Sequence, residues 1–556
     1  MKDISKDVFT YIIGGKAGEG INKAGDAASN LFSKEFKRNV FNIIDYQSLI
    51  RGGHNFSVVS TSTRDLASHY MKADLIINLD ERSLNKHKDH LAKDGLMINN
   101  SDKIEEEGGV GLPFSGTAKD YSRPNLILGV SGIAVLTSIL GLDKEQMKGF
   151  VEKEYSRGAK ENVEFAEKIY DMSKEKKLWK KFELDYGENT GPVVSGNESI
   201  SLGAASAGLD MYIGYPMTPA SSILHFFARH VDDLQVMTVH PESEIAVANL
   251  AIGGTITGAR TMVGTSGGGM ALMEEAFSLA GMAESPVLFI VSSRPGPSTG
   301  VPTYTEQGDL NFALHQGHGE FPKIVSSPGS IEEAFYLSSE MLNLVWKFQT
   351  PGILLSEKHL SESGMTVDLD PESTSWAEPK KHDDGEYKRY LDTEDGVSPL
   401  LFPPSNEVIK WSSKEHDEKG ISTERPEIIT KMHDKRGRKM DAIVDHLKEI
   451  NTVNYYGDGG PTIFTYGSTT MSVLEALKYG NIDATVVQPI YLKPFPVWEL
   501  NDFEGKDVIA VEQSSIGQFA TLLKDKINVK INNNIKKYDG RAFEPIPLAA
   551  KIKEVI

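Results

Sequence analysis

The feature that most constrains the fold is a repeated order of a short β-rich run, a glycine-containing turn and a helix-compatible stretch. Residues 8–32 begin with this order, and further β-rich runs are expected at 39–45, 54–60, 73–79 and 95–100. Polar stretches of helical type separate these runs. Such alternation is typical of layered proteins in which helices cover a mostly parallel sheet. We therefore predict an α/β fold.

The length of 556 residues exceeds what a single hydrophobic core usually organises, so several domains are expected. A charged, helix-prone stretch at 143–183 is followed by GENTGPVVSGNES, which breaks the periodicity. The alternating pattern resumes near 199, gives way to polar, proline-containing sequence at 365–430, and then recovers. These changes predict three α/β domains and a connection, with the following bounds: an N-terminal domain at 1–185, a second at 195–370, an irregular connection at 371–450 and a smaller domain at 451–556.

Composition excludes several classes of protein. The formal charge of −19 argues against nucleic-acid binding, because phosphate backbones are held chiefly by clustered Lys and Arg. The chain has no cysteine, which excludes disulfides, thiolate metal sites and Cys-ligated iron–sulfur clusters within it. No apolar stretch approaches the ~20 residues that span a bilayer, and the start of the chain runs into a strand-like segment. We expect a cytoplasmic protein with no membrane contact and no metal ligands of its own.

The segment GGKAGEG, at 14–20, places small residues between a predicted strand and a predicted helix. Its spacing is not that of a dinucleotide G-x-G-x-x-G, and Ile21 stands where a Walker motif has Lys. Two interpretations stay open. Gly15, Gly18 and Gly20 form either a tight turn or an anion contact at the helix N-terminus, for which coenzyme A is a candidate.

Three further segments carry candidate functional side chains. In YPMTPAS, at 215–221, Thr218 is either the N-cap of a helix or a rigidly presented hydroxyl, and both roles can coexist. In HPESEIAVANLAIGG, Glu242 and Glu244 precede an apolar helix, where acids commonly offset the helix dipole. A buried Glu244 carboxyl would instead need a partner, such as a cofactor nitrogen. In the long loop 292–310, Arg294 is suited either to a substrate carboxylate or to a structural ion pair.

A possible diphosphate signature fails on spacing. The GDG at 457–459 is not followed, some twenty-five to thirty residues later, by the Asn pair that thiamine enzymes use with it to hold magnesium and diphosphate. This GDG is therefore interpreted as a turn, and the diphosphate half of a thiamine site is missing from the chain.

Taken in order, YPMTPAS, ESEIAVANLAIGGTITGARTMVGTSGGG, RPGPSTGVPTYTEQGDL and GHGEFPKIVSSPGSIEEAF resemble the alpha subunit of 2-oxoacid:ferredoxin oxidoreductases. The N-terminal GGKAGEG and SLIRGGHNFSVV resemble the gamma subunit of the same enzymes, so the chain resembles their fused gamma-alpha form. The resemblance implies an N-terminal gamma-type domain, a thiamine pyrimidine-binding-like domain and a smaller transketolase C-terminal-like domain.

The resemblance also implies an active site shared between two chains. This chain would hold the aminopyrimidine end of thiamine diphosphate, with Glu244 bonding the ring, and Tyr215 and Pro216 lining the cofactor. Thr218 would hydrogen-bond the 2-oxoacid and Arg294 would hold its carboxylate. A beta subunit would supply Mg²⁺, the diphosphate site and a four-iron four-sulfur cluster, pass electrons to ferredoxin and give the acyl group to coenzyme A.

The family pattern leaves the substrate open. We expect 2-oxoglutarate first, with pyruvate and branched-chain 2-oxoacids as alternatives. Two positions depart from the pattern, since Ser293 replaces a common Gln and Met217 a usual Ile. Two other functions remain: a coenzyme A- or nucleotide-binding acyl-transfer subunit without redox chemistry, and a structural partner whose loops only shape another subunit's pocket.

Overall fold

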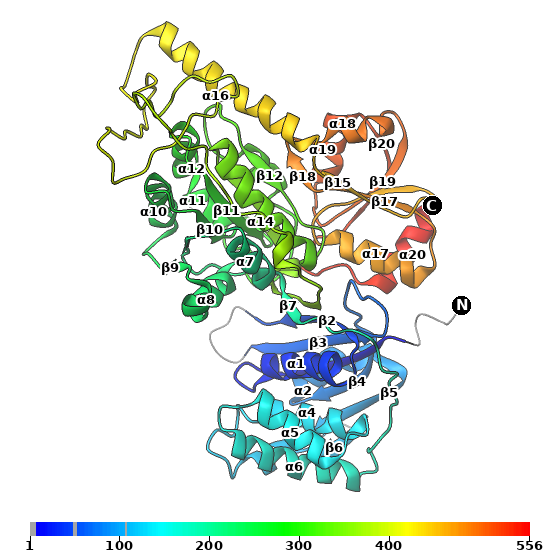
Figure 1. Cartoon of the computed structure of the whole chain (residues 1–556). Coiled ribbons are helices and arrows are strands. Elements are labelled where there is room, and N and C mark those ends of the chain that lie inside the picture. Colours follow the sequence, from blue (N-terminus) through cyan, green and yellow to red (C-terminus); the bar gives the residue numbers. More distant parts are fainter. Residues whose placement is uncertain (1–6, 48–52, 106–107) are drawn as a thin grey trace.

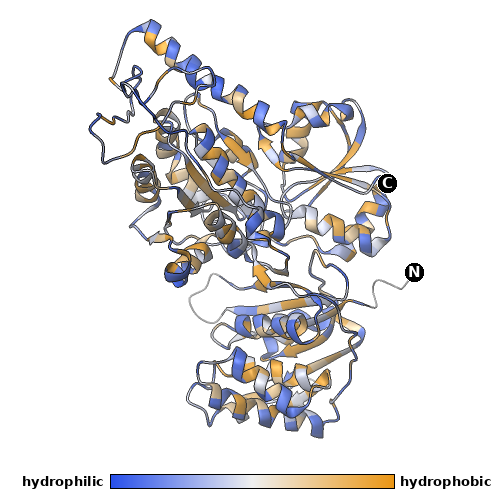
Figure 2. Cartoon of the chain, viewed as in Figure 1, coloured by the Kyte–Doolittle hydropathy of each residue, from blue (hydrophilic) through white to orange (hydrophobic). Residues whose placement is uncertain are grey.

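The computed structural model describes residues 7–47, 53–105 and 108–556. Residues 48–52 of the gamma-like stretch SLIRGGHNFSVV lie outside these ranges. Three sheets of eight, seven and five strands follow one another along the described chain, each with helices packed beside it (Figure 1). Figure 2 shows that the strands are predominantly hydrophobic, whereas most helices alternate between polar and apolar residues. The predicted α/β fold class is confirmed.

The N-terminal sheet has the strand order β6-β5-β4-β1-β3-β2-β14-β7. Its strands are β1 (Phe9–Lys16), β2 (Asn39–Asp45), β3 (His54–Ser62), β4 (Ala73–Asn78), β5 (Leu91–Asn100), β6 (Val110–Leu112), β7 (Val193–Ser195) and β14 (Gly364–Thr366). The helices of this part are α1 (Ile21–Asn30), α2 (Glu81–His87), α3 (Phe114–Ala118), α4 (Leu128–Ile139), α5 (Lys144–Glu154) and α6 (Ala159–Glu175). The four strands predicted between 39 and 100 all form, because each carries a run of apolar residues that is buried against these helices.

The middle sheet has the order β18-β12-β13-β11-β10-β8-β9, and only β18 runs antiparallel to its neighbour. Its strands are β8 (Met211–Ile213), β9 (Met237–Val239), β10 (Thr261–Thr265), β11 (Val287–Ser293), β12 (Ile324–Ser326), β13 (Gly352–Glu357) and β18 (Tyr491–Lys493). The helices are α7 (Gly196–Ser206), α8 (Ser221–Arg229), α9 (Val231–Leu234), α10 (Glu244–Ile256), α11 (Gly267–Leu272), α12 (Glu274–Met282), α13 (Leu310–His315), α14 (Ile331–Phe348) and α15 (Lys358–Glu362). Because these neighbouring strands are parallel, the loops that follow them lie at the same edge of the sheet.

The third sheet has the order β15-β17-β16-β19-β20. Its strands are β15 (Val453–Tyr456), β16 (Thr462–Phe464), β17 (Thr485–Pro489), β19 (Asp507–Glu512) and β20 (Lys530–Lys536), and its helices are α17 (Thr469–Gly480), α18 (Val497–Leu500), α19 (Gln518–Ile527) and α20 (Pro545–Val555). The GDG at 457–459 lies in the connection between β15 and β16, as the turn interpretation predicts.

The prediction of an irregular connection at 371–450 is wrong for its last third. Residues 426–447 form α16 (Pro426–Leu447), which begins at a proline suited to the first helical turn and runs from the middle sheet toward the third (Figure 1). Its many charged residues concealed the helix, because Lys435 and Lys439 are buried and not solvent-facing.

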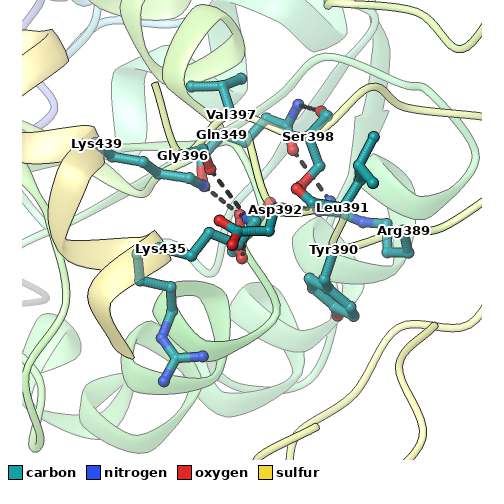
Figure 3. Close-up of polar contacts among 12 residues, drawn as sticks. Gln349, Arg389, Tyr390, Leu391, Asp392, Gly396, Val397, Ser398, Lys435 and Lys439 are labelled. Atoms are coloured by element: carbon teal, nitrogen blue, oxygen red, sulfur yellow. Dashed lines mark hydrogen bonds and ion pairs between the residues drawn. The ribbon is translucent and has the colours of Figure 1, made fainter. Parts of the chain in front are cut away.

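Buried ion pairs hold α16 and the connection to the rest of the molecule. Lys435 Nζ lies 2.9 Å from both carboxylate oxygens of Glu284, and Lys439 pairs with the same carboxylate. Lys439 also donates to the carbonyl of Gln349 (2.9 Å), and Lys435 donates to that of Gly396 (3.0 Å) (Figure 3). Burial alone would raise the pKa of Glu284, but the lysines and Arg389 hold it well below its usual range.

Candidate functional site

Four loops meet at the carboxyl edge of the middle sheet. They follow β8, β9, β10 and β11, which are parallel, and the strands end in register: Ile213 pairs with Val239 and Val263, and Thr265 pairs with Val291. The loops carry all of the candidate site residues predicted for this part of the chain. This edge is where α/β sheets bind ligands.

Thr218 and Arg294 are in direct contact. Arg294 directly follows β11, and its Nη1 donates to the carbonyl oxygen of Thr218 at 2.7 Å. This is the only hydrogen bond that the guanidinium makes within the described ranges, so most of its donors remain open to an anionic group. Burial lowers the pKa of Arg294, whereas the charge of Asp309 opposes that change. A half-buried guanidinium with open donors is suited to a carboxylate.

Glu244 is buried, whereas Glu242 is exposed. Glu244 is the first residue of α10 and retains only 4% of its exposure, next to the N-cap Ser243. Its Oε1 has no hydrogen-bond partner among the described residues. A buried carboxyl oxygen is seldom left unpaired, because no hydrogen bond then offsets the free energy lost when it leaves water. The structure therefore separates the two acids: only Glu244 can offer a buried acceptor to a ligand.

The glycine segment after β10 packs closely against Glu244. A Cβ atom at Gly269 would lie 1.9 Å from Thr265 Oγ1 and 3.0 Å from Glu244 Cγ, whereas one at Gly268 would meet nothing closer than 3.9 Å. The segment therefore packs directly on Glu244, which only a glycine at 269 permits. The buried Glu244 Oε1, which has no partner among the described residues, fits a planar, hydrogen-bonding group such as an aminopyrimidine.

The remaining predicted residues of this edge lie at its surface. Tyr215 and Pro216 are exposed, and the Tyr215 ring lies 6.0 Å from that of His240. Both departures from the family pattern have a local partner. The Ser266 hydroxyl lies 2.6 Å from the sulfur of Met217, and Ser293 donates to Asp309 at 2.8 Å.

Asp309 is a site residue that sequence reasoning missed. Burial raises its pKa, and the Ser293 hydrogen bond and the Arg294 charge oppose that change. A Cβ at Gly267 would lie 2.5 Å from its carboxylate, so Asp309 packs under the glycine segment. Its place at the end of TEQGDL, within the predicted loop, was the available signal.

The segment GGKAGEG lies on the N-terminal sheet, and its three candidate glycines differ. A Cβ at Gly15 would meet the carboxylate of Glu19 at 2.5 Å, and that carboxylate accepts from the Lys16 amide and pairs with Lys103. The start of the loop thus carries an anion of its own. Gly18 faces open space, and Gly20 caps α1 in the left-handed conformation (φ 77°).

A cavity of about 780 Å³ adjoins Gly20. Its lining includes the basic side chains of Lys23, Arg123, Arg157 and Lys160 and the acidic side chains of Glu154 and Glu161, and Lys23 pairs with Glu154 at 3.3 Å. The caps of α1 and α6, Gly20 and Gly158, also line it, and neither helix has a side-chain cap. Of the three glycines, Gly20 is therefore the one whose surroundings suit an anion.

Within the described ranges, no three His, Asp or Glu side chains are grouped so as to hold a metal ion. None of the helices described above combines the length and hydropathy needed to cross a bilayer.

Comparison with known proteins gives consistent matches. Residues 10–172 match the family "Pyruvate ferredoxin/flavodoxin oxidoreductase", and residues 202–435 match "Pyruvate flavodoxin/ferredoxin oxidoreductase, thiamine diP-bdg". A 2-oxoacid:ferredoxin oxidoreductase subunit alpha of a Sulfolobus species is 29% identical, over 96% of this chain and 95% of that protein. Subunit alpha of 2-oxoacid:ferredoxin oxidoreductase 2 from Aeropyrum pernix is 30% identical, over 99% and 98%.

A solved structure has nearly the same fold throughout. The 2-oxoglutarate:ferredoxin oxidoreductase of Magnetococcus marinus, with 2-oxoglutarate, coenzyme A and succinyl-CoA bound, superimposes with a TM-score of 0.88 at 28% identity, over 99% of both chains. This match covers the N-terminal, middle and third sheets. The chain therefore belongs to the family of 2-oxoacid:ferredoxin oxidoreductase alpha subunits.

Proposed function

We propose that this chain supplies the pyrimidine-side half of a thiamine diphosphate-dependent active site that oxidatively decarboxylates a 2-oxoacid, with 2-oxoglutarate as the favoured substrate. The observation that carries the proposal is the buried Oε1 of Glu244, which has no partner among the described residues, at the same sheet edge as the joined pair Arg294 and Thr218. The solved relative named above binds 2-oxoglutarate and coenzyme A, which supports both as substrates here.

Each side chain has a defined task. When bound, thiamine diphosphate supplies the carbon nucleophile and the electron sink for decarboxylation. Glu244 accepts a hydrogen bond from the aminopyrimidine through Oε1. This hydrogen bond orients the ring and favours the tautomer of the ring that can take up a proton. Arg294 binds the 2-oxoacid carboxylate through its open donors, and the Thr218 hydroxyl orients the keto group. Tyr215 and Pro216 cover the cofactor from the exposed side of the loop.

A beta subunit is proposed to complete the site. Four large apolar side chains are exposed on the elements around Glu244, namely Met237, Ile245, Leu250 and Leu272, each at least 47% accessible. Exposed apolar side chains on elements around a half-formed site support a partner subunit that covers them. We propose that the partner brings Mg²⁺, the diphosphate site and the four-iron four-sulfur cluster, from which ferredoxin takes electrons in the cytoplasm.

Two further assignments are proposals. The cavity at Gly20, whose lining holds more basic than acidic side chains, is a candidate contact for the phosphates of coenzyme A, with Gly15 and Gly18 in the turn that precedes Gly20. We also propose the division into a gamma-type domain (1–185), a pyrimidine-binding domain (195–370), a connection (371–450) and a transketolase C-terminal-like domain (451–556).

The test is the complex of this chain with its small subunit, assayed for viologen reduction across a panel of 2-oxoacids. Glu244→Gln should reduce kcat about a hundredfold or more, because assisted proton transfer by a positioned side chain typically accelerates a reaction by at least that factor. Arg294→Ala should mainly raise KM for the 2-oxoacid. Glu242→Gln, at the exposed neighbouring acid, is the matched control and should retain activity.

Two results would contradict the proposal. A complex without iron whose 2-oxoacid-dependent activity needs no thiamine diphosphate would indicate acyl transfer without redox chemistry. Near-normal activity of both Glu244→Gln and Arg294→Ala would indicate that this chain only shapes a pocket of its partner.

A further inference from the structure

The long loop after β11, which begins with Arg294, is anchored to the part of the chain that forms the third sheet. In the second half of the loop, the Thr305 amide donates to the carbonyl of Gly540 at 3.2 Å. The Gln307 amide donates to the carbonyl of Gln513 at 2.8 Å, and the Gln307 side chain is almost fully buried. The second half of the loop is therefore fixed from the third sheet and not from the sheet that carries Arg294.

The first half of the loop has weaker support from its backbone. Val301 donates to the carbonyl of Pro295 at 3.0 Å and Tyr304 donates to that of Val301 at 3.2 Å, so both hydrogen bonds stay within the loop. A cavity of about 190 Å³ adjoins Thr303 and Tyr304, and the buried Thr303 hydroxyl has no partner among the described residues. Close packing therefore does not by itself determine where this half of the loop lies.

Arg541 provides a contact that holds this half in place. Its guanidinium lies 3.6 Å from the centre of the Tyr304 ring, which is a cation–π contact. Arg541 directly follows Gly540, whose φ is 77°. A Cβ atom at Gly540 would lie 3.2 Å from Tyr304 Cβ and 3.7 Å from Pro295 Cγ, so a glycine lets this turn approach the loop closely.

Asp45 holds the same guanidinium from the N-terminal sheet. Asp45 ends β2, its side chain is 8% exposed, and its Oδ2 lies 3.6 Å from Arg541 Nε. Lys86 Nζ lies 3.9 Å from the other carboxylate oxygen. Because Asp45 pairs with Phe56 of β3, the sheet fixes its position. Arg541 thus connects the N-terminal sheet, the loop of Arg294 and the third part of the chain.

We propose that Arg541 is a positioning residue for the 2-oxoacid, which holds Tyr304 in place and so keeps Arg294 where it can bind the substrate carboxylate. This inference rests on the proposed function and deepens it. It gives the third part of the chain, which contributes none of the candidate site residues named above, a role in substrate affinity.

The test is steady-state kinetics of the complete complex carrying Arg541→Ala. The variant removes both contacts and leaves Arg294 in the chain, so KM for the 2-oxoacid should rise about fivefold, the scale of a partly exposed cation–π contact, while kcat and KM for coenzyme A change less than twofold. Tyr304→Leu should give a similar rise, whereas Tyr304→Phe, which keeps an aromatic face, should not. The double variant of Arg541→Ala and Tyr304→Leu should be no worse than either single variant, because residues that act through one another are not additive.

Hydrogen exchange of the same complex measures the loop directly. In Arg541→Ala, the amides between 296 and 304 should exchange faster than in the wild type, because this half of the loop then leaves its position more often. The Gln307 amide, which is anchored to Gln513, should exchange at the wild-type rate.

Arg260→Ala is the matched control. Arg260 also lies over an aromatic ring, that of Trp376 at 4.9 Å, and pairs with a carboxylate, that of Asp210 at 2.8 Å. It directly precedes β10 and so lies at the edge of the middle sheet opposite to the candidate site. Arg260→Ala should lower the melting temperature without changing KM for the 2-oxoacid.

The outcomes separate this inference from the proposed function. A wild-type complex without thiamine-dependent activity overturns both. With an active wild type, the inference alone is overturned if Arg541→Ala leaves KM for the 2-oxoacid or the exchange of the loop unchanged, if it raises KM for coenzyme A in its place, if Arg260→Ala raises KM for the 2-oxoacid equally, or if the double variant is additive. Should Arg541→Ala fail to assemble, Tyr304→Leu must raise the same KM, and an unchanged KM then refutes the inference.

Discussion

At the residue scale, one missing side chain determines whether Glu244 can serve a ligand. A methyl group at Gly269 would crowd Thr265 Oγ1 at 1.9 Å and Glu244 Cγ at 3.0 Å. Gly269→Ala should therefore displace the Glu244 carboxyl, cost about 1–3 kcal/mol of stability and weaken thiamine diphosphate binding by at least tenfold. Titration of activity with the cofactor, alongside thermal unfolding, measures both effects. The matched control is Gly268→Ala, whose Cβ has open space, and equal behaviour of the two variants would contradict the argument.

The residues of this site differ in how far the sequence reveals them. Glu244, Thr218 and Arg294 lie in segments whose order along the chain resembles a known family, and the structure brings their loops to one edge. Their contact depends on the strand order, which no local pattern specifies. Asp309 was missed for the same reason, because only the fold brings its hydrogen-bond partner Ser293 and the glycine segment after β10 against it.

At the element scale, the attachment of α16 depends on one buried carboxylate. Glu284 faces Lys435 and Lys439, and all three are almost fully buried. Glu284→Gln leaves both lysines without a counter-charge, so it should lower the free energy of unfolding by about 3–5 kcal/mol in urea titrations. Glu386→Gln, which breaks the exposed pair with Lys419, should change stability little, and a comparable loss there would contradict this account.

The same carboxylate predicts a loss of stability in acid. The pKa of Glu284 is lower in the folded chain than its ordinary value of 4.5, so its contribution is complete above about pH 4.5. The contribution falls as the pH drops below that value and Glu284 takes up a proton. The stability difference between wild type and Glu284→Gln should therefore shrink with acidification, and a constant difference would contradict this assignment.

The missed helix shows where sequence patterns fail at this scale. Strands and amphipathic helices such as α6 were predictable because their apolar residues recur at regular spacing. In α16, three of the six buried positions are filled by Lys435, Arg436 and Lys439, whose ion pairs replace apolar contacts. A search for regularly spaced hydrophobic residues therefore misses a helix in which charged side chains occupy part of the buried face.

At the scale of the whole molecule, strands from one part of the chain pair with the sheet of a neighbouring part. β7 and β14, which flank the middle sheet in sequence, complete the N-terminal sheet, and β18 from the last part of the chain pairs with β12. One hydrophobic cluster correspondingly includes Phe41, Ile290 and Tyr491. The number and class of the sheets could be predicted from the alternation along the sequence. The pairing of β7, β14 and β18 with the sheet of another part of the chain could not, because strand pairing is a long-range property.

Glu357 offers a test of how the middle and third sheets are coupled. It ends β13, is almost fully buried, and accepts the backbone N–H of Ser468, at the start of α17, at 2.8 Å. Burial raises the pKa of Glu357 to about 7, so between pH 4.5 and 7 the folded chain holds a proton that the unfolded chain has released. Stability from this group is therefore greatest below pH 4.5, falls by about 3 kcal/mol as the pH rises to 7, and is constant above it.

Glu357→Gln cannot release a proton and should remove that slope, as measured by urea unfolding from pH 5 to 8. Glu504→Gln, at an exposed carboxyl, should leave the slope unchanged, and a wild-type slope retained in Glu357→Gln would show that this buried acid does not couple the two sheets to pH.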